Sequence, residues 1–287
     1  MDYIQIALIS ILLGFGIILV IFFFQSGGIK TIKPSSRSPY YKPTFLILGS
    51  NNSGKTSFYF KLLSHNDGNT TKENISTVSS IEPNISEVSL PIANPQIGKK
   101  FQLIDYPGHL KYQQLFEKLL LEDITIQNIK GIVYMIDSSS VNFNDQDSVE
   151  LIVKFLYHLI AITEKKHNGI DFLFAINKID LFDSLPIHKI KSILETEIDK
   201  LIHHEISNVD KTSGIDKAGG IEDDENDDHE RDVDGNLREF WLSVIGSPSG
   251  KFTFDKLEGN MDFFGGSVLK GKIEPWENWL DEKVVNP

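Results

Sequence analysis

The sequence predicts an α/β domain, with a mostly parallel central sheet covered by helices on both faces, preceded by one N-terminal transmembrane helix. Three observations lead to this prediction. Short apolar segments alternate with segments whose apolar residues recur at helical spacing. A glycine-rich loop stands between the first short apolar segment and the first of these helices. A longer, uninterrupted apolar run precedes them all.

The long apolar run extends from Ile4 to Phe24 and contains 21 residues without a charge. As a helix it would span roughly 31 Å, which matches the hydrocarbon core of a bilayer. A cleaved signal peptide is the alternative, but it would have a basic start and a shorter apolar core. The only charged residue before the run is Asp2. Because Lys30, Lys33 and Arg37 follow the run, the positive-inside rule predicts a cytosolic C-terminal side and a lumenal N-terminus.

Composition divides the chain into an anchor (1–25), a basic linker rich in Pro and Ser (26–43) and one domain (44–287). Residues 208–236 of the domain are acidic, glycine-rich and almost free of aromatic residues, which predicts a disordered insertion. This segment contributes most of the formal net charge of −12, so the charge indicates no nucleic-acid surface and we expect no direct nucleic-acid readout. The chain has no cysteine, which excludes disulfides and thiolate chemistry.

The glycine-rich loop fits the phosphate-binding pattern G-x-x-x-x-G-K-[ST] at every fixed position. Its backbone N–H groups would point at a phosphate chain, Lys55 would reach the β- and γ-phosphates, and the Thr56 hydroxyl would bind Mg²⁺. A chance match in a glycine-rich turn is the alternative, but the strand before the loop and the helix after it favour nucleotide binding. The predicted phosphate-binding residues of the loop are Gly49, Ser50, Asn51, Asn52, Ser53, Gly54, Lys55, Thr56 and Ser57.

The rest of the domain supplies the other layers of the predicted fold. Strands are expected over 45–48, 87–90, 101–104, 131–136, 171–176 and 261–264, with the second and third forming a hairpin. Helices are expected over 112–121, over 149–162, from Pro186 toward residue 205 and over 275–283. The predicted core stripes are Val149, Ile152, Val153, Leu156 and Leu159 on one helix and Trp276, Trp279 and Leu280 on the last.

The strand over 101–104 ends in a D-x-x-G pattern, Asp105 to Gly108. The carboxylate of Asp105 would hold the Mg²⁺ shell through water, and the Gly108 N–H would meet the γ-phosphate. Thr77 is the candidate for a threonine that completes the Mg²⁺ shell in the triphosphate state. Four other hydroxyl residues compete for this role: Thr70, Thr71, Ser79 and Ser80.

His109 follows the D-x-x-G glycine, where many GTPases carry a glutamine that orients the attacking water. A histidine with an ordinary pKa is mostly neutral and could hold this water, or it could point to solvent. We retain both readings, with His109 as the candidate catalytic residue.

The guanine signature N-K-x-D appears as Asn177, Lys178 and Asp180, directly after a predicted strand. The Asp180 carboxylate can accept hydrogen bonds from the N1–H and exocyclic amine of guanine, an arrangement that adenine lacks. Lys178 would lie along the base, and Asn177 would brace the loops. A further backbone N–H from Gly266, Ser267 or Val268 would meet the guanine oxygen. GTP with Mg²⁺ is therefore the expected ligand.

Together with the N-terminal span, these segments resemble the beta subunits of the signal recognition particle receptor, and fungal members in particular. The resemblance rests on GSNNSGKTS, TVSS, DYPGH, NKID, KFTFDKLEG and GGSVLKGKIEPWENWLDEK. It implies a Ras/Arf-like P-loop GTPase domain on the endoplasmic reticulum membrane, with GTP mainly a regulatory or structural ligand and slow hydrolysis left open. It also implies that the switch segments, around 77–80 and 105–111, bind the N-terminal domain of the receptor's alpha subunit. Ribosome targeting would thereby be coupled to the translocation channel.

Two other functions remain as alternatives. The first is a cycling Arf/Sar-like GTPase that recruits a vesicle coat. Such proteins usually have a reversible lipid anchor, whereas Asp2 as the second residue excludes myristoylation here. The second is a scaffold that has lost nucleotide binding, against which the intact Lys55, Thr56, Asp105 and Asp180 argue.

Overall fold

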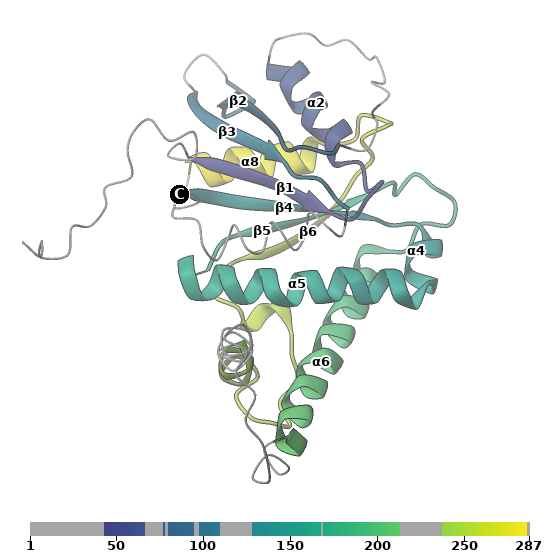
Figure 1. Ribbon diagram of the computed structural model, residues 1–287. Coiled ribbons are helices and arrows are strands. Elements are labelled where there is room, and N and C mark those ends of the chain that lie inside the picture. Colours follow the sequence, from purple (N-terminus) through teal and green to yellow (C-terminus); the bar gives the residue numbers. More distant parts are fainter. Residues whose placement is uncertain are drawn as a thin grey trace, which may run out of the picture. The chain divides into compact units, whose positions relative to one another are not determined.

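A six-stranded sheet, in the order β2-β3-β1-β4-β5-β6, forms the centre of the domain (Figure 1). The computed structural model of the protein describes residues 43–66, 77, 80–94, 98–109, 128–167, 169–212 and 237–285. The strands are β1 (Thr44–Gly49), β2 (Asn84–Leu90), β3 (Lys99–Asp105), β4 (Ile129–Asp137), β5 (Phe172–Asn177) and β6 (Met261–Gly265). Only the pairing of β2 with β3 is antiparallel, and the other four pairings are parallel. The predicted hairpin and parallel sheet are therefore confirmed.

Helices cover both faces of this sheet (Figure 1). They are α2 (Lys55–Asn66), α4 (Ser140–Asn144), α5 (Gln146–His167), α6 (Ile187–Thr212), the single turn η2 (Phe254–Lys256) and α8 (Glu274–Val285), together with a helical segment over 237–245. The core of one face contains side chains of α2 and α8, and the core of the other contains side chains of α5, α6 and 237–245.

Strand alternation explains how one strand serves two cores. In β1, Phe45 and Ile47 point into the α2–α8 core, whereas Leu46 and Leu48 point into the α5–α6 core. All four side chains are almost completely buried. A strand covered on both faces must be apolar throughout, and this is the reason that FLIL reads as a continuous apolar run.

The predicted core stripes are also confirmed. All five apolar residues of the α5 stripe and all three of the α8 stripe are buried. On α8, Trp276 donates a hydrogen bond from Nε1 to the Phe264 carbonyl at 2.9 Å, and Trp279 donates to Asp262 at 2.8 Å. Each indole thus buries its ring against the sheet and satisfies its only donor on β6.

Two of the differences from the sequence prediction flank the acidic insertion. The segment over 237–245 is helical and buries Trp241 completely, although regular structure was expected to resume only near Phe252. Adjacent acidic composition hides the short apolar pattern of this helix. Second, α6 continues to Thr212, seven residues beyond the expected Glu205 and into the first residues of the predicted insertion. The polar residues at the end of α6 give no apolar pattern in the sequence, but they do not prevent a helix from continuing.

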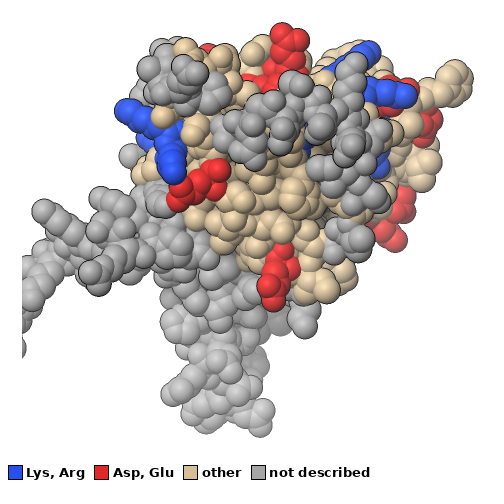
Figure 2. Space-filling view, turned by 90° about the horizontal axis from the view of Figure 1, so that it is seen from above, with Lys and Arg blue, Asp and Glu red and all other residues tan. Residues whose placement is uncertain are grey.

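Several predicted segments lie outside the described residues. They are the transmembrane run, the linker as far as residue 42, the helix over 112–121 and the insertion from residue 213 to 236. Among the helices that the structure does describe, none has the length and apolar character needed to cross a bilayer. On the face in Figure 2, Lys and Arg lie in small groups interspersed with Asp and Glu, and neither sign of charge dominates its described part.

Candidate functional site

Parallel strands bring the predicted motifs to one edge of the sheet. The phosphate loop follows β1, the D-x-x-G segment begins at the last residue of β3, and N-K-x-D begins at the last residue of β5. The G-S-V segment follows β6. Because β1, β3, β5 and β6 all run in the same direction, their carboxyl ends share this edge, where ligands bind in open α/β sheets.

The phosphate loop adopts a backbone that depends on its two glycines. Gly49 has φ of 136° and Gly54 has φ of 99°, both in the range that L side chains rarely adopt. A Cβ on Gly54 would lie 2.3 Å from the Asn177 Nδ2 atom. The loop is closed from within by the Ser53 hydroxyl, which donates to the Ser50 carbonyl at 2.9 Å.

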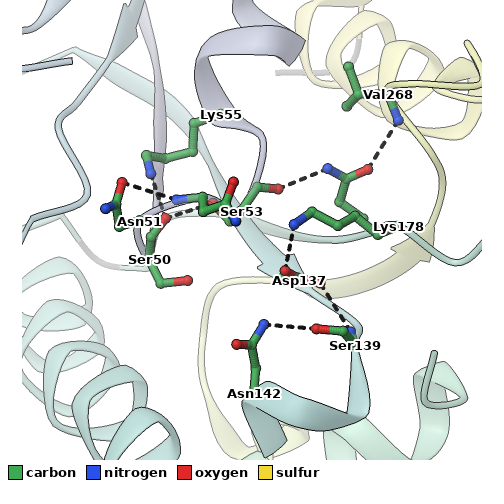
Figure 3. A network of polar contacts seen from close by, with 11 residues as sticks. Ser50, Asn51, Ser53, Lys55, Asp137, Ser139, Asn142, Lys178 and Val268 are labelled. Atoms are coloured by element: carbon green, nitrogen blue, oxygen red, sulfur yellow. Dashed lines mark hydrogen bonds and ion pairs between the residues drawn. The ribbon is translucent and has the colours of Figure 1, made fainter. Parts of the chain in front are cut away.

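Lys55 is almost completely buried under this loop, and its Nζ donates to the Ser50 carbonyl at 2.7 Å (Figure 3). Burial lowers the pKa of this ammonium to about 8, and the Asp105 carboxylate partly opposes the shift. A buried cation at the start of a helix is a favourable place for an anion. A phosphate chain would add negative charge beside Lys55 and further favour its ammonium form.

Thr56 and Asp105 form the predicted metal corner. The Thr56 hydroxyl donates to Asp105 Oδ2 at 2.8 Å, and Asp105 is fully buried at the end of β3. The other carboxylate oxygen, Oδ1, is buried and accepts no hydrogen bond from the described residues. Burial raises the pKa of Asp105, whereas hydrogen bonds from Asn84 and Thr56 and the charge of Lys55 lower it. An unsatisfied carboxylate oxygen suits a site completed by a hydrated cation.

This donor set fits Mg²⁺. In the described part of the chain, no group of three or more His, Asp or Glu side chains could hold a metal. Mg²⁺ typically uses one or two protein oxygens together with water and substrate phosphates, and Thr56 and Asp105 could supply such oxygens.

Thr77, the predicted switch threonine, contacts Ser57, the residue that follows Thr56. Its Oγ1 is 3.0 Å from the Ser57 hydroxyl. Among the hydroxyl candidates that the structure describes, it is Ser80 that approaches Thr56, with 3.3 Å between the two oxygens. Ser80, named above as a competitor, is therefore nearer to the metal corner in this arrangement. Thr70, Thr71 and Ser79 lie outside the described residues.

Asn177 joins three segments of the site, as its predicted bracing role requires. Its Nδ2 donates to the Ser53 carbonyl at 2.8 Å, and its Oδ1 accepts from the Val268 N–H at 3.0 Å. The side chain is buried, so both bonds are shielded from water. One amide thus fixes the phosphate loop and the G-S-V loop to the end of β5.

Lys178 and Asp180 extend from the same turn. Lys178 has φ of 64°, and its Nζ forms an ion pair with Asp137 Oδ2 at 2.6 Å (Figure 3). Asp180 is exposed at the edge, where a base can reach it. Asp137, at the end of β4, also accepts the Ser139 N–H and so anchors the turn into α4. Asp137 was not among the residues predicted from the sequence. It could have been found because it ends a buried apolar strand, β4, which lies between the motif-bearing strands β1 and β5.

The structure distinguishes among the three backbone N–H groups that could contact the guanine oxygen. The Gly266 N–H donates to the Ile176 carbonyl and the Ser267 N–H to the Lys272 carbonyl, so both are used in the backbone. The Val268 N–H donates to the side-chain amide oxygen of Asn177, and a ligand oxygen could share this donor. We therefore expect Val268, rather than Gly266 or Ser267, to make this contact.

Gly108 lies directly against the phosphate loop. A Cβ at this position would be 2.4 Å from Lys55 Nζ and 2.8 Å from the Gly49 carbonyl, so only glycine allows this approach. The exposed His109 and Gly108 line a pocket of about 270 Å³ with Ser50, Asn51, Asp137, Asn142, Ser148, Leu151 and Ile152. His109 therefore lies beside the phosphate loop, which is compatible with the predicted role in positioning water.

The strand order, the single antiparallel pairing and the glycine-rich loop after β1 define an α/β domain of the small GTPase fold. A model of the signal recognition particle receptor beta subunit family matches residues 40–261. The chain is also 31% identical over 279 residues to signal recognition particle receptor subunit beta of Saccharomyces cerevisiae. This alignment covers 96% of this chain and 98% of the yeast protein. The chain belongs to the family of signal recognition particle receptor beta subunits.

Other relatives agree with this assignment. The corresponding subunit of Dictyostelium discoideum is 28% identical over 258 residues, covering 88% of this chain and 74% of that protein. Among solved structures, the mammalian SRP receptor has a TM-score of 0.57 at 22% identity, covering 84% of this chain and 99% of its own. An SRb-GTP/SRX complex from Chaetomium thermophilum has a TM-score of 0.57 at 21% identity, covering 84% and 98%. These structural likenesses establish the fold, and the family match does not favour the coat-recruiting alternative.

Proposed function

We propose that this chain is a membrane-anchored GTP-binding subunit that holds the receptor's alpha subunit at the endoplasmic reticulum membrane in a GTP-dependent manner. The observation that carries the proposal is the Asn177 amide, which fixes the phosphate loop and the G-S-V loop beside the guanine signature. A phosphate site and a base site joined in this way favour a guanine nucleotide. The SRb of Chaetomium thermophilum was solved both as an SRb-GTP/SRX complex and as SRb-GDP-Mg, which supports GTP, Mg²⁺ and the alpha-subunit partner.

The released nucleotide tests this function directly. The full-length chain, purified in detergent alone and with the alpha-subunit N-terminal domain, is denatured, and the nucleotide is identified by chromatography. We expect GTP in the complex, because switch segments ordered by the γ-phosphate would form the partner surface. GDP in both preparations, together with alpha-subunit binding that does not depend on the nucleotide, would contradict GTP-dependent docking.

The proposed anchor is the apolar run from Ile4 to Phe24, with the GTPase domain in the cytosol. Deletion of residues 2–25 is expected to release the protein from membranes into the alkaline carbonate supernatant, whereas the full chain stays in the pellet. The physical reason is that 21 uncharged, mostly apolar residues are enough to span the hydrocarbon core. Deletion of 213–236 is the control and should leave the protein in the pellet. A pelleted 2–25 deletion would indicate a different attachment.

Nucleotide binding should take up a proton at alkaline pH. The pKa of Lys55 is lowered to about 8, so at pH 8.5 most of the free protein carries a neutral amine. Bound phosphates favour the ammonium, so binding at pH 8.5 is expected to take up most of one proton at this group, and binding at pH 6.5 almost none. Calorimetry in buffers of different ionisation enthalpy measures the difference. Equal uptake at both pH values would show that Lys55 is charged before the nucleotide arrives.

A further inference from the structure

Asn84 stands opposite the metal-corner carboxylate in the antiparallel pair of β2 and β3. It is the first residue of β2, and its cross-strand partner is Asp105, the last residue of β3. Directly opposed residues of an antiparallel pair point to the same face and are close enough to interact. The register of the hairpin therefore fixes the Asn84 side chain beside the Asp105 side chain.

Both donors of the Asn84 amide have an acceptor at this site. Nδ2 is 2.9 Å from Asp105 Oδ2 and 3.0 Å from the Ser80 hydroxyl. A primary amide nitrogen has two hydrogens, so it can donate to both at once. The Thr56 hydroxyl also donates to Asp105 Oδ2 and lies 3.3 Å from Ser80. The side chains of Asp105, Thr56, Ser80 and Asn84 thus form a closed ring of polar contacts that includes Asp105 Oδ2.

The ring has a consequence for the second carboxylate oxygen. Thr56 and Asn84 both donate to Oδ2, whereas no described residue donates to the buried Oδ1, so Oδ1 is the oxygen that can accept from the water shell of a metal ion. Without the Asn84 donor, Oδ2 would keep only Thr56 as a partner. The carboxylate could then rotate about its bond to Cβ and present either oxygen to the metal ion. Groups that orient a ligand in this way commonly change metal affinity by about 10- to 100-fold.

We propose that Asn84 is a positioning residue for Mg²⁺: its amide holds the Asp105 carboxylate in the orientation that binds the hydrated ion, and links it to the Ser80 segment. This inference rests on the proposed binding of a guanine nucleotide with Mg²⁺. It predicts that Asn84 controls the Mg²⁺ dependence of nucleotide retention and leaves Mg²⁺-free nucleotide binding unchanged.

The test measures release of a fluorescent GDP analogue from the full-length chain in detergent at a series of free Mg²⁺ concentrations, including excess chelator. For Asn84→Ala, the free Mg²⁺ that gives half-maximal slowing of release should rise about tenfold, with the release rate in chelator unchanged. Asn84→Leu keeps most of the side-chain volume without a donor and should show the same rise. If the leucine variant restores the wild-type Mg²⁺ dependence, the effect comes from packing and the proposal is wrong.

Ser86→Ala is the matched control. Ser86 lies two residues along β2 on the same face, and its hydroxyl accepts a hydrogen bond from the Tyr59 hydroxyl of α2 at 2.6 Å. It therefore tethers the same strand to the domain without touching Asp105, and its Mg²⁺ dependence should match the wild type. An equal shift in Ser86→Ala and Asn84→Ala would overturn the proposal, as would an unshifted Asn84→Ala.

The same measurements separate this inference from the proposed function. Wild-type protein that binds no fluorescent GDP even in Mg²⁺ would contradict guanine-nucleotide binding itself. Wild-type protein that binds and retains GDP in Mg²⁺, with Asn84 variants that respond to Mg²⁺ identically, would contradict only the role of Asn84.

Discussion

Replacing Asp180 with asparagine is expected to lower the affinity for GDP about 10²- to 10³-fold and to create affinity for xanthosine diphosphate. Asp180 lies exposed at the carboxyl edge, beside the turn that holds Lys178. Its carboxylate would accept from both guanine donors, and hydrogen bonds to a charged group contribute about 1.5–3 kcal/mol each. An asparagine amide can accept only one of them and presents an NH₂ group to the other.

Xanthine explains the expected gain. It carries a carbonyl oxygen where guanine carries the exocyclic amine, so the asparagine NH₂ can donate to this oxygen while its own oxygen accepts the N1–H. Competition of both diphosphates against a fluorescent nucleotide measures the exchange of specificity.

Asp183→Asn is the matched control, because it removes the same charge from an exposed position three residues along the same loop. It should leave both affinities near the wild-type values. Equal loss of GDP affinity in the two variants would mean that the charge of the loop, and not contact with the base, determines binding.

Replacing Gly49 with alanine is expected to lower the free energy of unfolding by about 4 kcal/mol or more. A Cβ at this position would lie 2.2 Å from the carbonyl oxygen of Met135, its register partner in β4, and neither backbone can move without disturbing the sheet. The φ of 136° adds strain for any residue with a side chain. Because a typical domain is stable by only about 5–15 kcal/mol, this loss would leave the site poorly folded.

Gly246→Ala separates backbone strain from the clash. Gly246 also has a positive φ, 77°, but a Cβ there would meet no atom within 4 Å. Its cost should be about 1 kcal/mol, the ordinary penalty for a left-handed residue with a side chain. Urea unfolding followed by the fluorescence of the buried tryptophans compares the two variants. Similar losses would show that the Met135 contact relaxes without significant cost.

Local sequence patterns were enough to predict most of the strands and the residues of the two nucleotide-binding motifs. A strand must be apolar on both faces when helices cover both, so β1, β4 and β5 were visible as continuous runs. The phosphate loop and the guanine signature are contiguous, so their residues could be named from sequence. The helix over 237–245 was missed because a short apolar stripe beside an acidic segment has little periodic signal. Its Trp241 packs against Tyr157 of α5, with 4.9 Å between the ring centres, and against Phe252, and these contacts exist only in the folded domain.

The sequence by itself determined which residue types reach the carboxyl edge: Lys55 and Thr56 after β1, Asp105 after the hairpin, and Asn177 to Asp180 after β5. Only the tertiary structure decided how these side chains support one another. Asn84 meets Asp105 through the register of the hairpin, Lys178 meets Asp137 through the pairing of β4 with β5, and Asn177 meets Ser53 from 124 positions away. Such contacts leave no local pattern, because strand order and register determine which distant residues become neighbours.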